Sequence, residues 1–380
     1  MSAPQPERVT NGQHLETRRR EVAGRYRDPD GKEHARHFAR KVDAERWLDG
    51  VRGELVTGAY IDPNAGKLTV EEYAEEWRTA QVHRTGTQVR VDGHFRLHVY
   101  PMLGDRQLRH VRPTEIQAWV RGLQDDLSPR TVDNVYRYLK AVFTAAVADG
   151  LIRSNPCVGV KLPKAPPRKV VPLDVVQVRA LADAAPDRYR AVIITGAGIG
   201  LRLGELLGLD LARVDFLRRR ITVDRQLVDE SGVGPVLTPP KTQASYRTVP
   251  APNIVLETLA AHLARYPATE GGLIFTNANG DPIRHNRFSD MWRATVTKTK
   301  LEPERDTTRP HDLRHHYASL LIHHGESVKV VQDRLGHATA AETLNTYAHL
   351  WPDSEDRTRE AVDEMLGAAF ADSPRAEGVG

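Results

Sequence analysis

The chain of 380 residues is longer than one hydrophobic core usually serves, so two or three domains are expected, each of about 100–200 residues. A single cysteine, Cys157, excludes a disulfide framework, and the lack of an apolar run of about 18 residues excludes a membrane span, which leaves a cytoplasmic protein as the expectation. The net charge of only +4, from 54 basic and 50 acidic residues, excludes a uniformly basic protein, so a surface for a polyanion requires charges segregated onto one face.

The first segment, residues 15–60, is predicted to form a small domain of a β-hairpin and a helix. A turn of sequence Asp-Pro-Asp-Gly separates stretches suited to strands, and apolar residues then recur at helical spacing. The expected elements are strands at Glu21–Arg27 and Lys32–Phe38 and a helix at Val42–Leu55. Arg25 and Arg27 on the hairpin are candidates for contact with phosphate groups; a solvated hairpin face is the alternative interpretation.

Residues 67–153 are predicted to form a helical domain. Thr69 and Glu72 have the spacing of a capping box at the start of its first helix. The last helix begins at Ser128, a natural N-cap, with Pro129 in the first helical position, and its apolar residues share one face. The opposite face carries Arg130, Asn134 and Arg137. Such a stripe is typical of a helix that contacts a nucleic acid backbone, although surface helices often carry similar residues.

Residues 154–172 are rich in proline, which predicts an extended linker between domains. The stretch contains basic residues and no acidic one, so it would gain affinity along a nucleic acid by releasing counterions. The basic residues are Lys161, Lys164, Arg168 and Lys169.

Residues 173–366 are predicted to form the largest domain, and 367–380 a disordered tail. Helical patterns lead into short strands, and further helices follow to the end of the domain. The expected helices before the strands are at Asp174–Asp183, Tyr189–Thr195 and Gly204–Leu209, and the expected strands are at Ile221–Gln226, Val236–Leu237 and Arg247–Val249. The fold class is therefore expected to be mainly α with small β elements (α+β), the last domain being mixed α/β.

One stretch of this domain, residues 191–200, resembles a strand that enters a glycine-rich, dinucleotide-binding turn. The resemblance fails at Arg202, which occupies the position of the final glycine, where the backbone would approach a pyrophosphate. The rest of the domain also lacks the alternation of strands and helices of a parallel sheet. We therefore predict a buried helix and turn over Ala191–Gly198, and a nicotinamide-dependent dehydrogenase is the least favoured alternative.

Two motifs place an arginine beside another polar residue. In Gly-Leu-Arg-Leu-Gly-Glu, Arg202 and Glu205 are three residues apart, so they can interact on one face of a helix. In His-Asp-Leu-Arg, His311 and Arg314 have the same spacing. His311 and His315 are spaced as metal ligands on a helix, but the glutamate and the third ligand of a zinc protease are missing, so no metal is expected.

Two further motifs follow towards the C-terminus. Ser327 is a suitable N-cap for a helix that ends at Gly336, directly before His337. Thr339 opens another helix, which reaches Tyr347 in the sequence Thr-Leu-Asn-Thr-Tyr-Ala-His. Taken singly, His337 can be interpreted as a helix cap and Tyr347 as a core aromatic residue. These separate interpretations explain poorly why arginine, histidine and tyrosine occur together in this pattern.

The four motifs, in this order and spacing, resemble the signature motifs of the tyrosine recombinase (phage integrase) family. A fifth position of that family, a lysine in a β-hairpin turn, matches Lys241 in Pro-Pro-Lys-Thr-Gln-Ala-Ser-Tyr-Arg-Thr. Residues 67–152 resemble the helical core-binding domain of the family, and residues 20–60 are similar to the small arm-binding domains of integrases. The resemblance implies an enzyme that cuts and rejoins DNA at specific sites, working in the bacterial cytoplasm in association with the nucleoid.

The residue types suit this chemistry, because phosphoryl transfer needs positive charge around the non-bridging oxygens of the phosphate. The resemblance implies that Arg202 and Arg314 hold the phosphate, a task for which a planar guanidinium is better suited than an ammonium group. It further implies that His337 donates another hydrogen bond. Glu205 is expected to orient Arg202 rather than to touch DNA.

The nucleophile implied by the resemblance is Tyr347, which would form a 3′-phosphotyrosyl intermediate. At its ordinary pKa of ~10, only about one tyrosine hydroxyl in a thousand is ionised at pH 7, so a base is needed. The resemblance assigns that role to His311, and assigns to Lys241 the protonation of the departing 5′ oxygen. No metal, nucleotide or other cofactor is expected.

The resemblance also implies an assembly. Partners would be double-stranded DNA attachment sites, a homo-tetramer on two duplexes with a Holliday junction intermediate, and an accessory protein that bends DNA or sets direction. Residues 354–366 are a candidate helix for exchange between protomers. The main alternative from another class is a DNA-binding regulator that keeps the fold without cleaving, and covalent attachment to DNA distinguishes the two.

Overall fold

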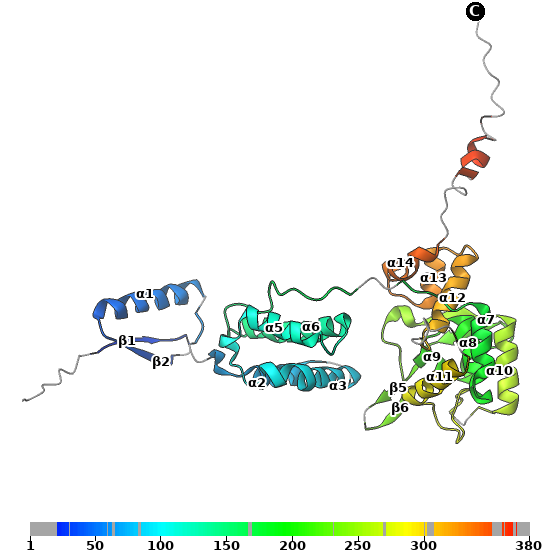
Figure 1. Ribbon diagram of the computed structural model, residues 1–380, viewed down its shortest axis with the longest axis horizontal. Helices are drawn as coiled ribbons and strands as arrows, with labels where there is room; N and C mark the ends of the chain where they lie inside the picture. The colour runs from blue at the N-terminus through cyan, green and yellow to red at the C-terminus, as the bar shows by residue number, and fades with distance from the viewer. Residues whose placement is uncertain are drawn as a thin grey trace, which may run out of the picture. The chain divides into compact units, whose positions relative to one another are not determined.

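The computed structural model describes residues 21–351 except 30, 59, 63–64, 83–84, 166–168, 231, 269–270, 300 and 302–307, and also describes 359–360, 362–367 and 370. The chain forms two compact units, Met1–Ala165 and Pro166–Gly380 (Figure 1). Helices dominate both units and the sheets are small, which confirms the expected fold class. Among the described residues, no helix is long and apolar enough to cross a membrane.

Unit 1 begins with the predicted hairpin, β1 (Val22–Arg27) paired antiparallel with β2 (Glu33–Phe38), and the helix α1 (Lys41–Thr57) that packs on it. Trp47 of α1 covers the hairpin at Gly24, where a Cβ atom would lie 3.0 Å from the indole ring. Tyr26 meets the same indole edge-on at 5.4 Å. The aromatic contact fixes one face of the hairpin against α1 and leaves the other face to solvent.

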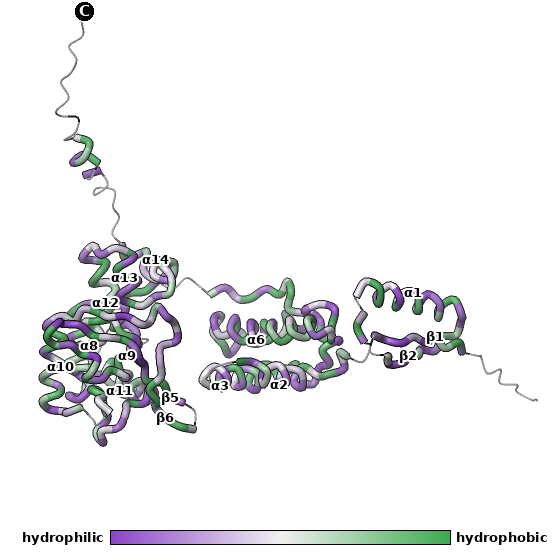
Figure 2. Tube along the Cα trace, turned by 180° about the vertical axis from the view of Figure 1, so that it is seen from behind, coloured by the Kyte–Doolittle hydropathy of each residue, from purple (hydrophilic) through white to green (hydrophobic). Residues whose placement is uncertain are grey.

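The rest of unit 1 is a helical bundle with a buried apolar core that includes Trp119 and Phe143. Its α-helices are α2 (Val70–Ala80), α3 (Thr85–His94), α4 (Tyr100–Leu103), α5 (Pro113–Leu123) and α6 (Pro129–Ala148). Apolar and polar residues alternate along these helices (Figure 2), as expected when one face of each helix lies in the core. Thr69 and Glu72 form the predicted capping box, and Ser128 caps α6 as predicted.

The proline-rich stretch after α6 is in contact with the bundle over its first part. Cys157 is buried in the core, and Val160 and Leu162 pack against it. The side-chain amide of Gln117 binds the backbone of Lys161 twice, donating to its carbonyl at 3.0 Å and accepting from its N–H at 2.8 Å. These contacts place the boundary between the two units after Ala165.

Unit 2 is built around the buried helix α8 (Asp187–Ile199). Helices α7 (Val175–Ala184), α10 (Asn253–Arg265) and α12 (Asp312–His323) pack against it. The prediction of a buried helix and turn at this place is confirmed, and residues 187–199 do not form the strand of a dinucleotide-binding unit. Gly200 ends α8 with a positive φ of 63°, and a Cβ atom there would lie 2.3 Å from the ring of Tyr317. Glycine is therefore required as the first residue of the motif that contains Arg202.

The strands of unit 2 form two sheets, one of order β3-β4-β7 and one of order β5-β6. Their bounds are β3 (Val214–Asp215), β4 (Arg220–Val223), β5 (Gln226–Glu230), β6 (Gly234–Thr238) and β7 (Arg247–Pro250). The single strand predicted over Ile221–Gln226 is wrong. The chain leaves the first sheet at Asp224 and Arg225, because both side chains form ion pairs there. Asp224 binds Arg213, and Arg225 binds Asp210.

Short helices flank the buried core of unit 2: α9 (Leu203–Leu207) follows Gly200, and α13 (Val328–Leu335) and α14 (Ala340–Tyr347) follow α12. Ser327 and Thr339 cap α13 and α14 with their hydroxyls, as predicted. Helix α11 (His285–Thr299) packs against α7. Of the helix predicted over residues 354–366, the structure describes 359–360 and 362–366, and Asp363–Gly367 forms a short π-helix. The predicted tail lies mostly outside the described residues.

Candidate active site

Three guanidinium groups converge on the C-terminal end of α13, where the last carbonyl groups lack partners inside the helix. Each side chain donates to one of three consecutive backbone carbonyls. Arg247 donates to the carbonyl of Arg334 at 2.9 Å, Arg314 to that of Leu335 at 2.6 Å, and Arg202 to that of Gly336 at 2.9 Å. The negative end of the helix dipole also favours cations at this place. Segments far apart in the sequence thus bring their positive charges to one point, directly before His337.

The turn that receives these arginines depends on Gly336. Its φ of +66° is the left-handed conformation that ends α13. The N–H of Gly336 donates to the carbonyl of Asp333 at 3.2 Å, and the N–H of His337 donates to the carbonyl of Gln332 at 3.1 Å. A Cβ atom on Gly336 would lie 2.9 Å from the carbonyl oxygen of Ala244. The Leu-Gly-His motif is therefore a compact helix end, and its glycine allows close approach of the segment that contains Arg247.

Arg314 is the most deeply buried cation of the group, with 1% of its surface exposed. One NH group donates to the carbonyl of Gly200 at 2.9 Å and another to Leu335. Burial, with the charges of Arg202 and Arg247, lowers the pKa of Arg314 to about 9. The guanidinium thus remains charged at neutral pH, held by carbonyl oxygens rather than by a carboxylate.

Glu205 is the carboxylate that balances part of this charge. It receives a hydrogen bond from the side chain of Arg202 at 3.0 Å and paired hydrogen bonds from Arg247 at 3.1 and 2.7 Å. The N–H of Arg202 also donates to it at 2.9 Å, since Arg202 is the residue before α9 rather than part of the helix. Burial alone would raise the pKa of Glu205, but the hydrogen bonds and charges of Arg247 and Arg202 hold it below its ordinary value. The predicted pairing of Arg202 with Glu205 is confirmed.

Tyr347 lies at the end of α14 and is 1% exposed. Its ring is parallel to that of His337, with 6.3 Å between centroids and 11° between planes. Its hydroxyl is 2.8 Å from Nδ1 of His315. Burial raises the pKa of Tyr347 to about 12, against an opposing effect of the charge of Arg314. The hydroxyl is therefore protonated at neutral pH.

His337 and His311 have pKa values lowered to about 3, in both cases by desolvation first and then by nearby positive charge. For His337 the main charges are Arg314 and Arg202. His337 is buried, and its Nδ1 lies 2.9 Å from the hydroxyl of Thr343. His311 is open to solvent, which screens the charges around it. The buried ring of His337 is therefore neutral at pH 7, whereas contact with water weakens the effect on His311.

The predicted residues do not all meet at this point. His311 contacts the ring of His315, edge to face at 4.8 Å. Lys241 is exposed, on the segment that joins β6 to β7. The expectation of a hairpin turn at Lys241 is wrong, because β6 and β7 belong to different sheets. Its ammonium group is thus on a segment that is not held by strand pairing.

The predicted phosphate contacts lie on exposed surfaces. On α6, Arg130 and Arg137 are exposed, and Arg137 binds Asp133 at 3.3 Å and Asn134 at 3.0 Å. On the solvent face of the hairpin, Arg25 and Arg27 share Glu33, at 3.1 and 3.5 Å. Lys161, Lys164 and Lys169 are exposed, and Arg168 lies outside the described residues.

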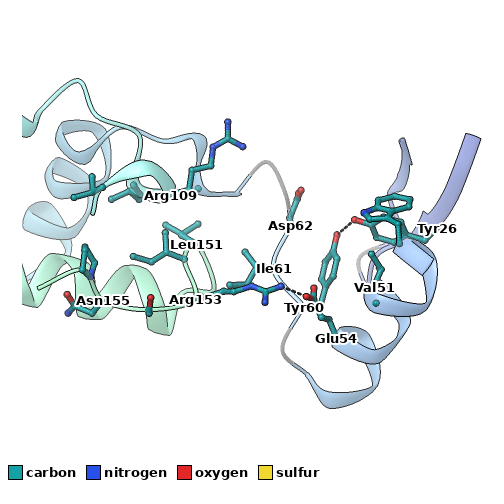
Figure 3. Close-up of a pocket in the computed structure, with 18 of the residues that line it drawn as sticks. Tyr26, Val51, Glu54, Tyr60, Ile61, Asp62, Arg109, Leu151, Arg153 and Asn155 are labelled. Carbon is teal, nitrogen blue, oxygen red and sulfur yellow. Dashed lines mark hydrogen bonds and ion pairs between the residues drawn. The ribbon is translucent and has the colours of Figure 1, made fainter. Parts of the chain in front are cut away.

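Two features of unit 1 do not coincide with any predicted site. Asp28, His34 and Asp62 come close enough to hold a metal ion, but Asp28 pairs with His34 at 2.8 Å and Asp62 with Lys32 at 3.6 Å. A cavity of about 660 Å³ is lined by residues that include Tyr26, Tyr60 and Leu151 (Figure 3). The hydroxyls of Tyr26 and Tyr60 lie 3.0 Å apart at its edge.

Sequence reasoning misses Arg247 and His315 as members of the site. Arg247 lies six residues after Lys241 in the same motif, yet its spacing to Arg202 and Glu205 carries no periodic signal. The sequence suggests His315 only as a metal ligand. Its position one residue after Arg314 puts it on another face of α12, and only the packing of α14 shows that this face meets Tyr347.

Family models match both units. The model of the phage integrase family matches residues 172–353, and the model of the phage integrase central domain matches residues 70–162. A similar relative is the prophage phiRv2 integrase of Mycobacterium tuberculosis strain H37Rv, which is 30% identical over 338 residues. That alignment covers 85% of this chain and 87% of the relative.

Solved structures show the same architecture. The Tn1549 transposon integrase in complex with a circular intermediate DNA matches with a TM-score of 0.68 and 26% identity, over 79% of this chain and 99% of that one. A lambda integrase tetramer bound to a Holliday junction matches with a TM-score of 0.55 and 18% identity, over 84% of this chain and 94% of that one. At that lower identity the likeness concerns the fold.

Proposed function

Because this chain belongs to the phage integrase family of tyrosine recombinases, it is a site-specific recombinase that cuts and rejoins DNA, and we propose that Tyr347 is its nucleophile. The observation that carries this assignment is the packing of Tyr347 against His337, the residue that follows the arginine-capped end of α13. The hydroxyl of Tyr347 therefore lies near Arg202 and Arg314, the arginines proposed to bind the phosphate.

The phosphate is held by Arg202 and Arg314. Arg202 donates to Gly336, Glu205 and Ser245, and Arg314 donates to Leu335 and Gly200. These bonds use only some of the N–H donors of the two guanidinium groups, and the others remain for phosphate oxygens. The carbonyl contacts orient both groups before DNA binds, so little reorganisation is needed when charge develops in the transition state. Neutral His337 supplies a further N–H, and Glu205 orients Arg202.

Cleavage forms a bond between Tyr347 Oη and phosphorus and breaks the bond from phosphorus to the 5′ oxygen. The phenolic proton passes to a histidine of α12, and Lys241 gives a proton to the departing 5′ oxygen. The product is a 3′-phosphotyrosyl bond, whose energy supports rejoining. Because Tyr347 is only 1% exposed, the segment around α14 has to shift before its hydroxyl can reach a phosphate.

The substrates are double-stranded DNA sites, and several copies of the chain act together. The Tn1549 integrase binds a circular intermediate DNA in its structure, and the chain shares its fold with a lambda integrase that forms a tetramer on a Holliday junction. These likenesses support a tetramer of this chain on two duplexes. Arg130, Asn134 and Arg137 on α6, with the hairpin arginines Arg25 and Arg27, are the proposed contacts to the DNA backbone.

Covalent trapping tests the assignment of the nucleophile. Wild type, Tyr347→Phe and Tyr317→Phe would be incubated with nicked duplexes tiled from DNA that flanks the gene, and then run on a denaturing gel. Tyr317 is a buried tyrosine of the same unit, so its variant controls for the loss of a hydroxyl. We expect an adduct with wild type and with Tyr317→Phe, and none with Tyr347→Phe although it still binds the same duplex. Sequence-specific binding without an adduct from wild type would favour the regulator.

A further inference from the structure

Among the described residues, the group that lies within hydrogen-bond distance of the Tyr347 hydroxyl and can accept its proton is His315, not His311. Nδ1 of His315 lies 2.8 Å from the hydroxyl oxygen, and the two rings meet edge to face at 5.6 Å. His311 begins the helix one turn earlier, and its ring contacts His315 instead of Tyr347. The order of contact is thus Tyr347, His315 and then His311.

The other groups around Tyr347 are unsuited to receive its proton. Arg314 is a cation, and it has no free lone pair. The ring of His337 lies parallel to the tyrosine ring, and its Nδ1 is engaged by the hydroxyl of Thr343 at 2.9 Å. Glu342 and Asp312 influence Tyr347 only through their charges. Direct hydrogen-bond geometry therefore selects His315.

The need for such an acceptor is large at this position. With a pKa of about 12, about one Tyr347 hydroxyl in 100,000 is ionised at pH 7. At 1% exposure, the hydroxyl also lacks the bulk water that could take its proton. Without an adjacent base, attack on phosphorus would begin from the un-ionised phenol.

We propose that His315 is the catalytic base of strand cleavage, and that His311 supports it from behind. His315 with its proton on Nε2 accepts the Tyr347 proton at Nδ1 while Oη bonds to phosphorus and the 5′ oxygen leaves with a proton from Lys241. On rejoining, the 5′ hydroxyl returns its proton to Lys241 as its oxygen bonds to phosphorus and displaces Tyr347, and the departing phenolate takes the proton back from Nδ1 of His315. This inference rests on the proposed function, since it needs Tyr347 to be the nucleophile.

The test compares His315→Gln with His311→Gln in the full-length chain, on a nicked duplex that wild type cleaves. The rate of adduct formation is measured at saturating DNA, and melting curves and DNA binding confirm that both variants fold. Glutamine keeps a hydrogen-bonding group but is no base. We expect His315→Gln to lose about 100- to 10,000-fold of the rate, and His311→Gln to lose less.

A second measurement shows whether His315 acts as a base or only holds the ring of Tyr347 in position. Tyr347 is replaced by a fluorinated tyrosine, whose phenol loses its proton more readily, in wild type and in His315→Gln. If His315 is the base, the fluorinated tyrosine should restore much of the cleavage rate that His315→Gln has lost, and should increase the rate of wild type only a little. The same role also predicts that the rate of His315→Gln with ordinary tyrosine rises more steeply from pH 7 to 9 than that of wild type.

The outcomes distinguish a failure of the proposed function from a failure of the role of His315. If wild type forms no adduct on any duplex that it binds, the proposed function fails and this inference with it. If wild type cleaves and His315→Gln cleaves at a similar rate, only the role of His315 is overturned. A large loss that the fluorinated tyrosine does not restore also overturns it, because the defect then lies in positioning.

Discussion

The end of α13 and the exposed face of α6 both present arginine, but the two regions hold it in different ways. At α13 the side chains are buried or partly buried, and backbone carbonyls fix each guanidinium. Glu205 also binds Arg202 and Arg247. On α6, Arg137 is exposed and binds only its helical neighbours, and Arg130 is exposed as well. A fixed cation can stabilise a transition state at one place, whereas a mobile one contributes attraction along a backbone.

This difference predicts that the two regions control different quantities, the rate of cleavage and the affinity for DNA. Variants at the end of α13 should change the rate of cleavage at saturating DNA and leave affinity almost intact. Variants on α6 should do the reverse. Both quantities come from the same assay, adduct formation as a function of DNA concentration.

The largest effect is expected from Arg314→Lys. A lysine keeps the charge, but one ammonium group cannot reach the carbonyls of both Gly200 and Leu335 and still bind a phosphate. The cleavage rate at saturating DNA should fall about 100- to 1,000-fold. Arg190→Lys, at an exposed position of α8 away from the end of α13, is the matched control and should cleave normally. A rate near that of wild type for Arg314→Lys would remove the distinction between the two regions.

Arg247→Lys should have the next largest effect. It removes the paired hydrogen bonds to Glu205 and the hydrogen bond to the carbonyl of Arg334, so Glu205 and the end of α13 are less well fixed. The free energy of unfolding should fall by about 1.5–3 kcal/mol, and the cleavage rate by about 10- to 100-fold through misplacement of Arg202. Denaturant melts and trapping rates measure the two. Loss of stability with an unchanged rate would make Arg247 a structural residue only.

On α6, the double variant Arg130→Gln with Arg137→Gln should weaken DNA binding with little sequence preference. The dependence of log Kd on log salt concentration should become shallower by about 0.9 for each phosphate that the variant no longer neutralises. The cleavage rate at saturating DNA should stay as in wild type. Arg121→Gln, an exposed arginine of α5, serves as the control for a change in net charge. An unchanged salt dependence would show that α6 faces away from DNA.

The smallest effect is expected in the pH dependence of the free energy of unfolding, to which His337 at the end of α13 contributes. The pKa of His337 is about 3 in the folded chain and about 6.5 when unfolded, so the unfolded chain binds the proton first as pH falls. The stability from this residue is complete above about pH 6.5 and is lost as the pH falls towards 3. Thermal melts from pH 7 to 4 should show a steeper fall for wild type than for His337→Gln. Equal slopes would mean that His337 is not shielded as the structure indicates.

Much of the local structure could be predicted, because the signals lie within a few residues of one another. The capping box of Thr69 and Glu72, the cap at Ser128 and the glycine at the end of α13 all formed as expected. The pairing of Arg202 with Glu205 also follows from its spacing. The prediction failed at Lys241 and at Asp224, where the partner of a strand is chosen by distant segments.

By itself, the sequence determined the identity of the chemical groups: arginine, histidine and tyrosine in motifs that indicated the family before any geometry was known. Tertiary structure alone decided which of them touch. Residues 202, 247 and 314 reach consecutive carbonyls only because α12, β7 and the start of α9 come together at the end of α13. The neighbour of Tyr347 is His315 for the same reason: a hydrogen bond between two helices depends on how they pack, and no spacing along the chain records that.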